Sequence, residues 1–172
     1  TLQFGIGHTG KAMEVLRADP AVEVVMPRVE FYGLVSAGGR SLPFAGIGVD
    51  PQAEARGSTI PRSVHQGQWL DAKDRGVVIG GGLAKALNAR LGSSVTLLAT
   101  TSDGTLNAID ATVRGIADIS IKELSERYLA LPLPLAQDLL SAPDTVSRIS
   151  VILKEPAREP EAAARLVEQL KQ

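Results

Sequence analysis

The spacing of hydrophobic residues predicts helices and strands that alternate near the start of the chain. Met13 and Leu16 fall on one face of a helix over Thr9–Ala18, which Pro20 brings to an end. Strands are expected before this helix at Thr1–Ile6 and after it at Val22–Met26, Arg28–Ser36 and Leu42–Val49. The last two strands form a hairpin, because the glycines of Ala37–Arg40 provide a turn between them.

A stretch without any period follows, and regular elements resume after it. Gln52–Arg75 has scattered polar residues interrupted by Gly and Pro, so we expect irregular structure, attached to the core through a largely buried Trp69. Further strands are expected at Val77–Ile79, Val95–Thr100, Leu106–Ile116 and Val146–Leu153. Helices are expected over Leu83–Leu91 with Gly92 as C-cap, over Ser120–Arg127 as one turn, over Leu135–Leu140, and from Pro160 with Ala163, Leu166, Val167 and Leu170 inward. Together these segments predict an α/β or α+β fold of mixed, largely antiparallel sheets with helices.

The composition is that of a globular protein and excludes several classes of function. Of the 172 residues, 44% are hydrophobic and 22% are charged, so the chain buries a sizeable core and is not disordered. The net charge is −1 and aromatic residues make up 3%, which argues against a nucleic-acid-binding surface. The absence of cysteine excludes disulfides, thiolate metal ligands and thiol nucleophiles.

The sequence contains neither a membrane span nor a signal peptide. No apolar run reaches the roughly 20 residues that a span needs, and no basic and apolar leader precedes the first strand. The chain starts at Thr1, within strand-like sequence and without a methionine. We therefore expect it to be a segment of a longer protein, and its location in the cell to be decided by the rest of that protein.

The glycine-rich turn before the first helix is the motif most suggestive of chemistry. Gly5, Gly7 and Gly10 satisfy the dinucleotide pattern GxGxxG, and Lys11 completes the GxxxxGK of a phosphate-binding loop. Ala12 stands where that loop needs a magnesium-binding hydroxyl, and the next segments predict a hairpin instead of repeated strand–helix units. A steric strand-to-helix turn is therefore the favoured interpretation, with a nucleotide-binding α/β domain as an alternative.

The remaining candidate residues have simpler structural explanations. Gly80–Gly82, with Lys85 beyond it, is expected to be a tight, closely packed strand-to-helix corner instead of a phosphate site. The other candidates are His8 and His65, which lack metal-ligand spacing, the carboxylate pairs Asp71 with Asp74 and Glu123 with Glu126, and Gly92–Val95, which lacks the closing glycine of GxSxG. We therefore expect no catalytic, cofactor-binding or metal site, and no enzyme activity.

Several short motifs, in order along nearly the whole chain, carry a resemblance to a known family. They are Val22–Arg28, Gly46–Pro51 with Glu54, Gly67–Leu70, Val77–Gly80 with Leu83, Ala84 and Leu87, Leu91–Gly92 with Val95–Leu97, and Val113–Ile116. Each motif alone is weak, and their common order is what is informative. In that order the sequence resembles the MacB-like periplasmic core domain of FtsX-type ABC transporter permeases, the group that includes MacB and the lipoprotein-releasing LolC and LolE.

The resemblance implies an architecture of two halves. Residues 1–50 and 144–172 are expected to form a porter-like half from both chain ends, and residues 51–143 an inserted sabre-like α/β half. In the family a strand closes the first half after the last helix, and we expect that strand to lie beyond this chain. Two stiff halves joined near Asp50 and Asp144 are able to shift as rigid bodies.

The resemblance also implies a non-catalytic role on the periplasmic side of the bacterial inner membrane, within an integral membrane protein. The domain is expected to couple cytoplasmic ATP hydrolysis to movement or extraction of an extracytoplasmic substrate, such as a lipoprotein, peptide, lipid or drug. Expected partners are the flanking transmembrane helices, the ATP-binding subunit or domain, a second permease copy or relative, and a periplasmic adaptor or carrier, without cofactor or nucleic acid. A free-standing extracytoplasmic ligand-binding protein is the other alternative, and no motif identifies the substrate.

Overall fold

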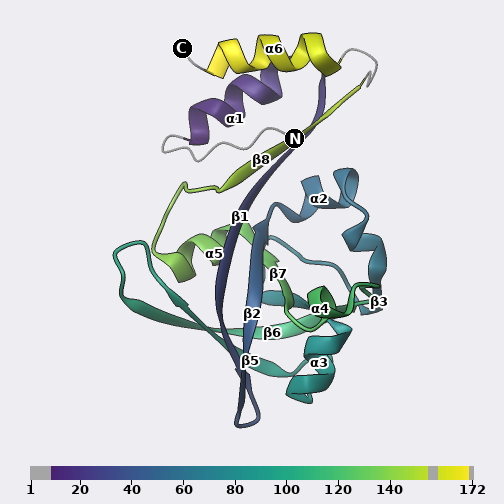
Figure 1. The fold of residues 1–172 in the computed structure, drawn as a ribbon, viewed down its shortest axis with the longest axis vertical. Helices are drawn as coiled ribbons and strands as arrows, with labels where there is room; N and C mark the ends of the chain where they lie inside the picture. Colours follow the sequence, from purple (N-terminus) through teal and green to yellow (C-terminus); the bar gives the residue numbers. More distant parts are fainter. Residues whose placement is uncertain (1–8, 155–158, 171–172) are drawn as a thin grey trace.

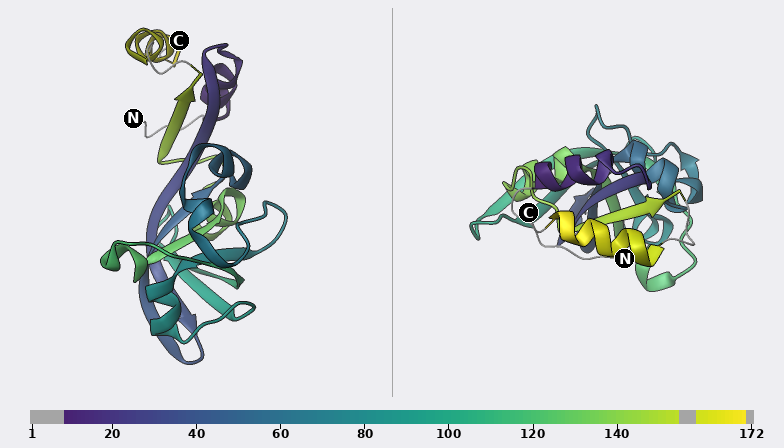
Figure 2. Two further views of the ribbon diagram at one scale, coloured as in Figure 1. Left: turned by 90° about the vertical axis from the view of Figure 1, so that its right-hand side faces the viewer. Right: turned by 90° about the horizontal axis from the view of Figure 1, so that it is seen from above.

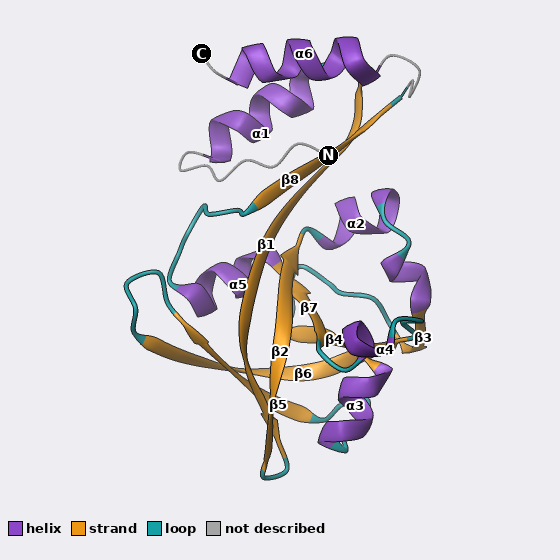
Figure 3. Cartoon of the chain, viewed as in Figure 1, coloured by secondary structure: helices purple, strands orange, loops and turns teal. Residues whose placement is uncertain are grey.

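One long strand, β1 (Val22–Ala37), runs along the molecule and takes part in both of its ends (Figure 1). The computed structural model describes residues 9–154 and 159–170. The other strands are β2 (Arg40–Val49), β3 (Val64–Gly67), β4 (Gly76–Gly80), β5 (Ser94–Thr100), β6 (Leu106–Ala117), β7 (Tyr128–Pro132) and β8 (Arg148–Leu153). The helices are α1 (Thr9–Ala18), α2 (Pro51–Gly57), the 3-10 helix η1 (Ile60–Ser63), α3 (Gly81–Leu87), α4 (Lys122–Ser125), α5 (Leu133–Leu140) and α6 (Glu159–Leu170). The mixed α+β class expected from the sequence is confirmed (Figure 3).

Most of the strands close into a ring that we call the barrel. Their order is β2-β7-β4-β6-β5-β1, and β1 also pairs with β2, so the last strand returns to the first. The pairs of β2 with β7 and of β4 with β6 are parallel, and the others in the ring are antiparallel. The core of the barrel includes Val35, Phe44, Val77, Leu97 and Leu129, together with Leu87 of α3 and Leu139 of α5.

The opposite end of the molecule, which we call the small end, consists of α1, α6, β8 and the first half of β1. β8 pairs with β1 from Val22 to Arg28, and α1 and α6 lie side by side over this short ladder (Figure 2). The small end has its own cluster of buried residues: Ala12, Met13, Leu16, Val22, Val25, Val146, Ile149 and Leu166. The two cores are therefore separate, and β1 contributes to both.

Two strands expected on either side of Pro27 are one continuous strand. The carbonyl of Arg28 accepts a hydrogen bond from the Ser147 amide on the β8 side, so Pro27 directs its backbone groups to the opposite edge. On that edge β2 ends with Val49 opposite Arg28, and no ladder bond is lost by the missing N–H of proline.

The stretch expected to be irregular contains a regular helix. α2 starts after Asp50, whose carboxylate accepts hydrogen bonds from the amides of Gln52 and Ala53, and Pro51 occupies its first turn. Trp69, expected to attach this stretch to the core, is partly buried against the cluster that includes Leu70 and Tyr128, and its indole donates to the Pro51 carbonyl at 3.1 Å.

Further differences concern the segments around α3, β7 and α6. α3 ends at Leu87, with Asn88 in the left-handed conformation that was expected of Gly92, and Leu91 lies beyond the helix. The strand β7 was not expected from the sequence, because all of its residues are buried and its apolar run has no period. Among residues 161–169 of α6, Ala162 and Leu166 are buried and Ala163 and Val167 are partly buried, while the side chain of Leu170 lies outside what the structure describes. Within residues 9–154 and 159–170, no helix has the length and apolar character needed to cross a membrane.

Candidate functional site

The structure places the sequence motifs suggestive of chemistry in separate parts of the molecule. Gly5, Gly7 and His8 of the glycine-rich turn lie outside the described residues. Gly10 and Lys11 are exposed on the first turn of α1, and the hydroxyl of Thr9 donates to the carbonyl of Asp144. The start of α1 is therefore connected to the chain segment that leads into β8.

The glycine run Gly80–Gly82 is explained by close packing, as expected. A side chain on Gly80 would collide with the carbonyl of Ser125, and a Cβ on Gly82 would lie 2.9 Å from Cγ of Glu126. The Gly82 amide donates to Oγ of Ser125 at 2.9 Å, so this N–H is already used within the protein. The run lets α3 begin directly against α4.

The histidine and carboxylate candidates do not converge on a common point. His65 is exposed on β3, Asp71 accepts from the amide of Lys73, and Glu126 forms an exposed ion pair with Lys122 at 3.8 Å. Within the described part of the chain, no three His, Cys, Asp or Glu side chains are placed to hold a metal ion.

Arg114 of β6 is the group that holds the loop before β4. Its guanidinium donates to the Trp69 carbonyl at 2.7 Å, to Oε1 of Gln68 at 3.2 Å and to the carboxylate of Asp74. Asp74 also accepts from the amide of Gly76 at 2.8 Å. Asp74 thus helps to fix this loop.

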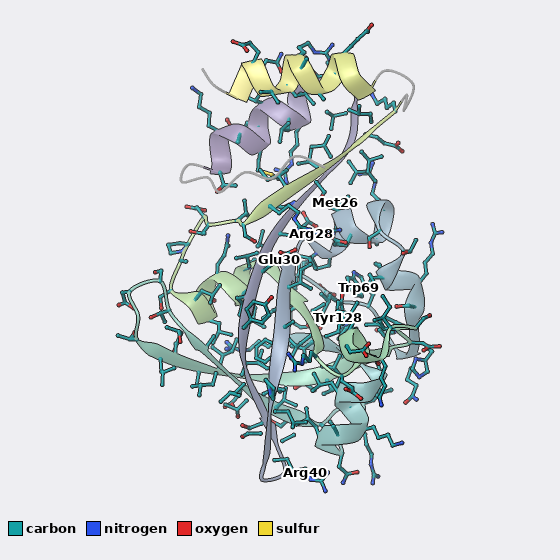
Figure 4. All side chains as sticks on the ribbon, in the orientation of Figure 1. Met26, Arg28, Glu30, Arg40, Trp69 and Tyr128 are labelled. Carbon is teal, nitrogen blue, oxygen red and sulfur yellow. The ribbon has the colours of Figure 1, made fainter. Side chains whose placement is uncertain are left out.

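A buried ion pair stands where the small end meets the barrel. Arg28 of β1, labelled in Figure 4, donates to both carboxylate oxygens of Glu54 on α2, with Nε–Oε1 2.6 Å and Nη2–Oε2 3.0 Å. The Glu54 side chain is 4% exposed. Two parallel bonds of this kind fix the orientation of both partners as well as their distance. The pair therefore ties the middle of β1 to α2.

Tyr128 lies close to this pair at the start of β7. Burial of the phenol raises its pKa, and the negative charge of Glu54 raises it further, while the positive charge of Arg28 acts in the opposite direction. Tyr128 is therefore neutral under ordinary conditions and belongs to the core cluster that includes Val49 and Ala130. Strands β1, β2 and β7 and helix α2 meet here, and we call Arg28, Glu54 and Tyr128 the junction.

A second ion pair holds the two helices of the small end. Arg165 of α6 donates to both carboxylate oxygens of Asp19, at 3.0 and 2.9 Å, just after the end of α1. The same carboxylate accepts from the amide of Ala21, at the start of the connection to β1. Asp19 therefore connects α6 to the segment that joins α1 and β1.

Sequence reasoning did not find either ion pair. The partners are separated by 26 residues in the junction and by 146 in the small end, so no local spacing connects them. Arg28 and Glu54 do stand within the motifs that carry the family resemblance, at the end of the first motif and just after the second. The two ion pairs connect the helices α2 and α6 to β1 and to the end of α1.

Comparisons with known proteins identify the family of the chain. The family model of the MacB-like periplasmic core domain matches residues 5–169. The chain is 30% identical over 157 residues to the lipoprotein-releasing system transmembrane protein LolE of Haemophilus influenzae. This match covers 88% of the chain but only 38% of the length of that relative.

Solved structures share the fold at lower identity. The extracellular domain of the noncanonical ABC-type transporter YknZ from Gram-positive bacteria superposes with a TM-score of 0.74 at 13% identity, covering 98% of this chain and 84% of that one. The periplasmic region of MacB from Actinobacillus actinomycetemcomitans gives a TM-score of 0.72 at 18% identity, covering 99% of this chain and 74% of that one. With the family model matched over most of its length, the chain belongs to the MacB-like periplasmic core domains of FtsX-type ABC transporter permeases.

Proposed function

We propose that the chain forms the extracytoplasmic part of an ABC transporter permease and couples ATP hydrolysis by a cytoplasmic partner to work on an extracytoplasmic substrate. The observation that carries the proposal is the position of α1 and α6, the described helices nearest to the two chain ends, which lie side by side at the small end (Figure 2). A domain inserted between two membrane spans needs both of its connections on one side. The small end would then face the membrane on the periplasmic side.

In this proposal the small end moves with the membrane spans and β1 transmits the motion. Val22 and Val25 pack in the core of the small end, whereas Val29 and Val35 of the same strand pack in the barrel. The junction braces β1 against α2 between these two cores. The family's division into a porter-like half, residues 1–50 and 144–172, and a sabre-like half, residues 51–143, is part of the proposal, with rigid-body movement of the halves.

The relative in Haemophilus influenzae points to the substrate class and the partners. Its name describes a lipoprotein-releasing transmembrane protein, so a lipoprotein is the first substrate to test, ahead of a peptide, a lipid or a drug. The proposed partners are the flanking transmembrane helices, a cytoplasmic ATP-binding subunit, a second permease copy or relative, and a periplasmic carrier. The domain itself would catalyse nothing.

The location is tested by labelling a single cysteine in the full-length protein. Ala72 is exposed in the loop before β4, and the chain has no cysteine of its own. We expect Ala72→Cys to react with a membrane-impermeant maleimide in intact spheroplasts as strongly as in lysed ones. Protection in intact spheroplasts, with labelling only after lysis, would place the domain in the cytoplasm and refute the proposal.

The coupling is tested at the junction, with the full-length permease and its ATPase in proteoliposomes. Glu54→Gln keeps the shape of the side chain but removes the charge that holds Arg28, so transport per ATP should fall about fivefold while ATP hydrolysis continues. The matched control is Glu30→Gln, also on β1, which removes a more exposed ion pair with Arg148 of β8. If Glu54→Gln had an unchanged melting temperature and unchanged transport per ATP, the proposal that the junction is needed for coupling through β1 would be refuted.

A further inference from the structure

A hollow of about 490 Å³ lies between β3 and the segment from α3 to Leu91, on the barrel and away from the small end. We call it the cationic groove. Its lining residues are His65, Gln66, Gly81, Ala84, Lys85, Ala89, Arg90, Leu91 and Ile116. The volume is within the range of pockets that bind small organic ligands. None of the proposed coupling steps uses it.

The groove is lined by cations without counter-ions. Lys85 and Arg90 are exposed, and among residues 9–154 and 159–170 their charged groups have neither an ion pair nor a side-chain hydrogen bond. In contrast, the guanidinium groups of Arg28, Arg114, Arg148 and Arg165 all pair with carboxylates. The lining residues include His65 and no carboxylate. The charge of the groove is therefore free to attract an anion.

The carboxylate of Glu126, beside the first turn of α3, is not part of the groove lining. Glu126 packs against Gly82, outside the lining residues, and its carboxylate forms an ion pair with Lys122 at 3.8 Å. Its charge is thus balanced on the α4 side. Lys85 and Arg90 remain the charges that a ligand in the groove would meet.

Beside the cations and Gln66, the lining has an apolar part. Ala84, Ala89 and Ile116 are buried and form the floor, whereas the Leu91 side chain stands at the wall with the residue 45% exposed. Leu91 is held against β3, since a Cβ on Gly67, where φ is +77°, would come within 2.7 Å of its Cδ2 atom. On the other side Gly81 leaves space, because the nearest atom to a Cβ there is 3.7 Å away. An apolar surface thus borders directly on unpaired cations.

We propose that the cationic groove binds an amphiphile with one anionic headgroup, a phosphate or carboxylate joined to a short apolar chain. The headgroup lies between Lys85 and Arg90, where charge-assisted hydrogen bonds form, and the arginine is suited to two oxygens of one group. The apolar chain covers Leu91 and Ile116. This inference goes beyond the proposed transport function and does not rest on it.

The test uses the isotope-labelled chain and three probes in ¹H–¹⁵N correlation spectra: hexyl phosphate below its micellar concentration, inorganic phosphate and hexanol. We expect hexyl phosphate to shift the amides of residues 65–67 and 81–91 saturably, with a Kd about tenfold lower than either of the others. If inorganic phosphate bound as tightly as hexyl phosphate, the groove would be a simple anion site, and the proposal of an amphiphilic ligand would be refuted. If hexanol bound as tightly as hexyl phosphate, Lys85 and Arg90 would not contribute to binding, and the proposal would likewise be refuted.

Variants separate the two parts of the groove. Lys85→Gln combined with Arg90→Gln should weaken hexyl phosphate binding about tenfold, and Leu91→Ala should weaken it about threefold without changing the affinity for inorganic phosphate. The matched control is Lys73→Gln, an exposed lysine before β4 that does not line the groove. If Lys73→Gln weakened hexyl phosphate binding as much, the loss would reflect only the net charge of the protein, and the proposed site would be refuted. Because all these measurements concern binding alone, their failure leaves the transport proposal standing.

Discussion

The barrel and the small end share β1, but they are held together by different means. In the barrel each strand of the ring has a neighbour on both sides, and side chains from α3 and α5 complete one large core. In the small end β8 pairs with β1 alone among the described strands, and two helices cover this ladder through a smaller cluster and the ion pair of Asp19 with Arg165. Closure gives the barrel many mutually dependent contacts, whereas the small end depends on few.

This difference predicts which region of the molecule unfolds locally at the lowest free energy. Local stability follows the density of buried apolar contacts, so segments with few of them exchange their amide hydrogens without global unfolding. We expect the amides of α1, β8 and α6 to exchange through such local opening, and those of β4, β6 and β7 only through global unfolding. The chain thus combines a region that opens locally with a region that opens only when the whole protein unfolds.

The largest effect is expected in the barrel. Phe44 is 1% exposed, and its ring meets Phe31 edge to face with centroids 5.6 Å apart. Phe44→Ala leaves a cavity that the ring of strands cannot collapse to fill, and we expect a loss of about 3–5 kcal/mol in the free energy of unfolding. Urea unfolding followed by circular dichroism measures this loss. A loss below about 1 kcal/mol would show that the barrel core repacks freely.

The same kind of change in the small end should act locally. Leu16 of α1 is buried between β1 and α6 with Met13 and Leu166. Leu16→Ala should cost about 2–4 kcal/mol, measured as faster hydrogen exchange of the amides in α1, β8 and α6, with the β4 and β6 amides still protected. Uniform acceleration over both regions would show that the two cores unfold as one unit and would remove the basis of the comparison.

The sequence predicted the small end better than the junction. α1 is confirmed over its whole range, because a ten-residue helix with a clear apolar face and a following proline is determined locally. β7 was missed because a strand buried on both faces has no alternation to detect. α2 was missed although Asp50, Pro51 and Glu54 are a helix-start signal, since the polar residues after them obscured the period.

The candidate site was less predictable than the fold for a physical reason. The pairing of Arg28 with Glu54 depends on how α2 packs against β1, and nothing in the local pattern reports this. The cationic groove likewise depends on α3 ending at Asn88, which turns Leu91 out of the helix and onto β3. The expected longer helix would have placed Leu91 in the core. Tertiary contacts thus decide which charged residues come together.

The junction should make the stability of the protein depend on pH at the alkaline side. The pKa of Tyr128 is raised in the folded protein, while in the unfolded chain it returns to its ordinary value of 10.0. Above pH 10 the unfolded state therefore loses a proton that the folded state keeps, and the free energy of unfolding falls with rising pH. Each pH unit should cost about 1.4 kcal/mol until the folded phenol also ionises.

Tyr128→Phe removes this dependence if the interpretation is right. Urea unfolding at pH 9, 10 and 11 should show a shallower decline in Tyr128→Phe than in the unchanged protein. Tyr32→Phe, which removes a phenol from an exposed ring, is the matched control and should keep the original slope. An identical slope in all three proteins would mean that Tyr128 ionises as readily in the folded state as in the unfolded chain.

The smallest effect is expected from the ion pair that joins the helices of the small end. The Arg165 side chain is 49% exposed, so the ion pair is partly screened by water. The Asp19 side chain is 4% exposed, and without Arg165 it keeps the hydrogen bond from the Ala21 amide. Arg165→Gln should therefore lower the global free energy of unfolding by less than about 1 kcal/mol. Hydrogen exchange should still detect the change as a modest acceleration in α6, since Leu166 of α6 continues to pack in the small end. Lys154→Gln, which removes a single bond to the Pro20 carbonyl, provides the comparison for a weaker contact in the same region. If Arg165→Gln instead lowered global stability as much as Phe44→Ala, the small end would be a required part of the barrel fold, and β1 would join one body instead of two.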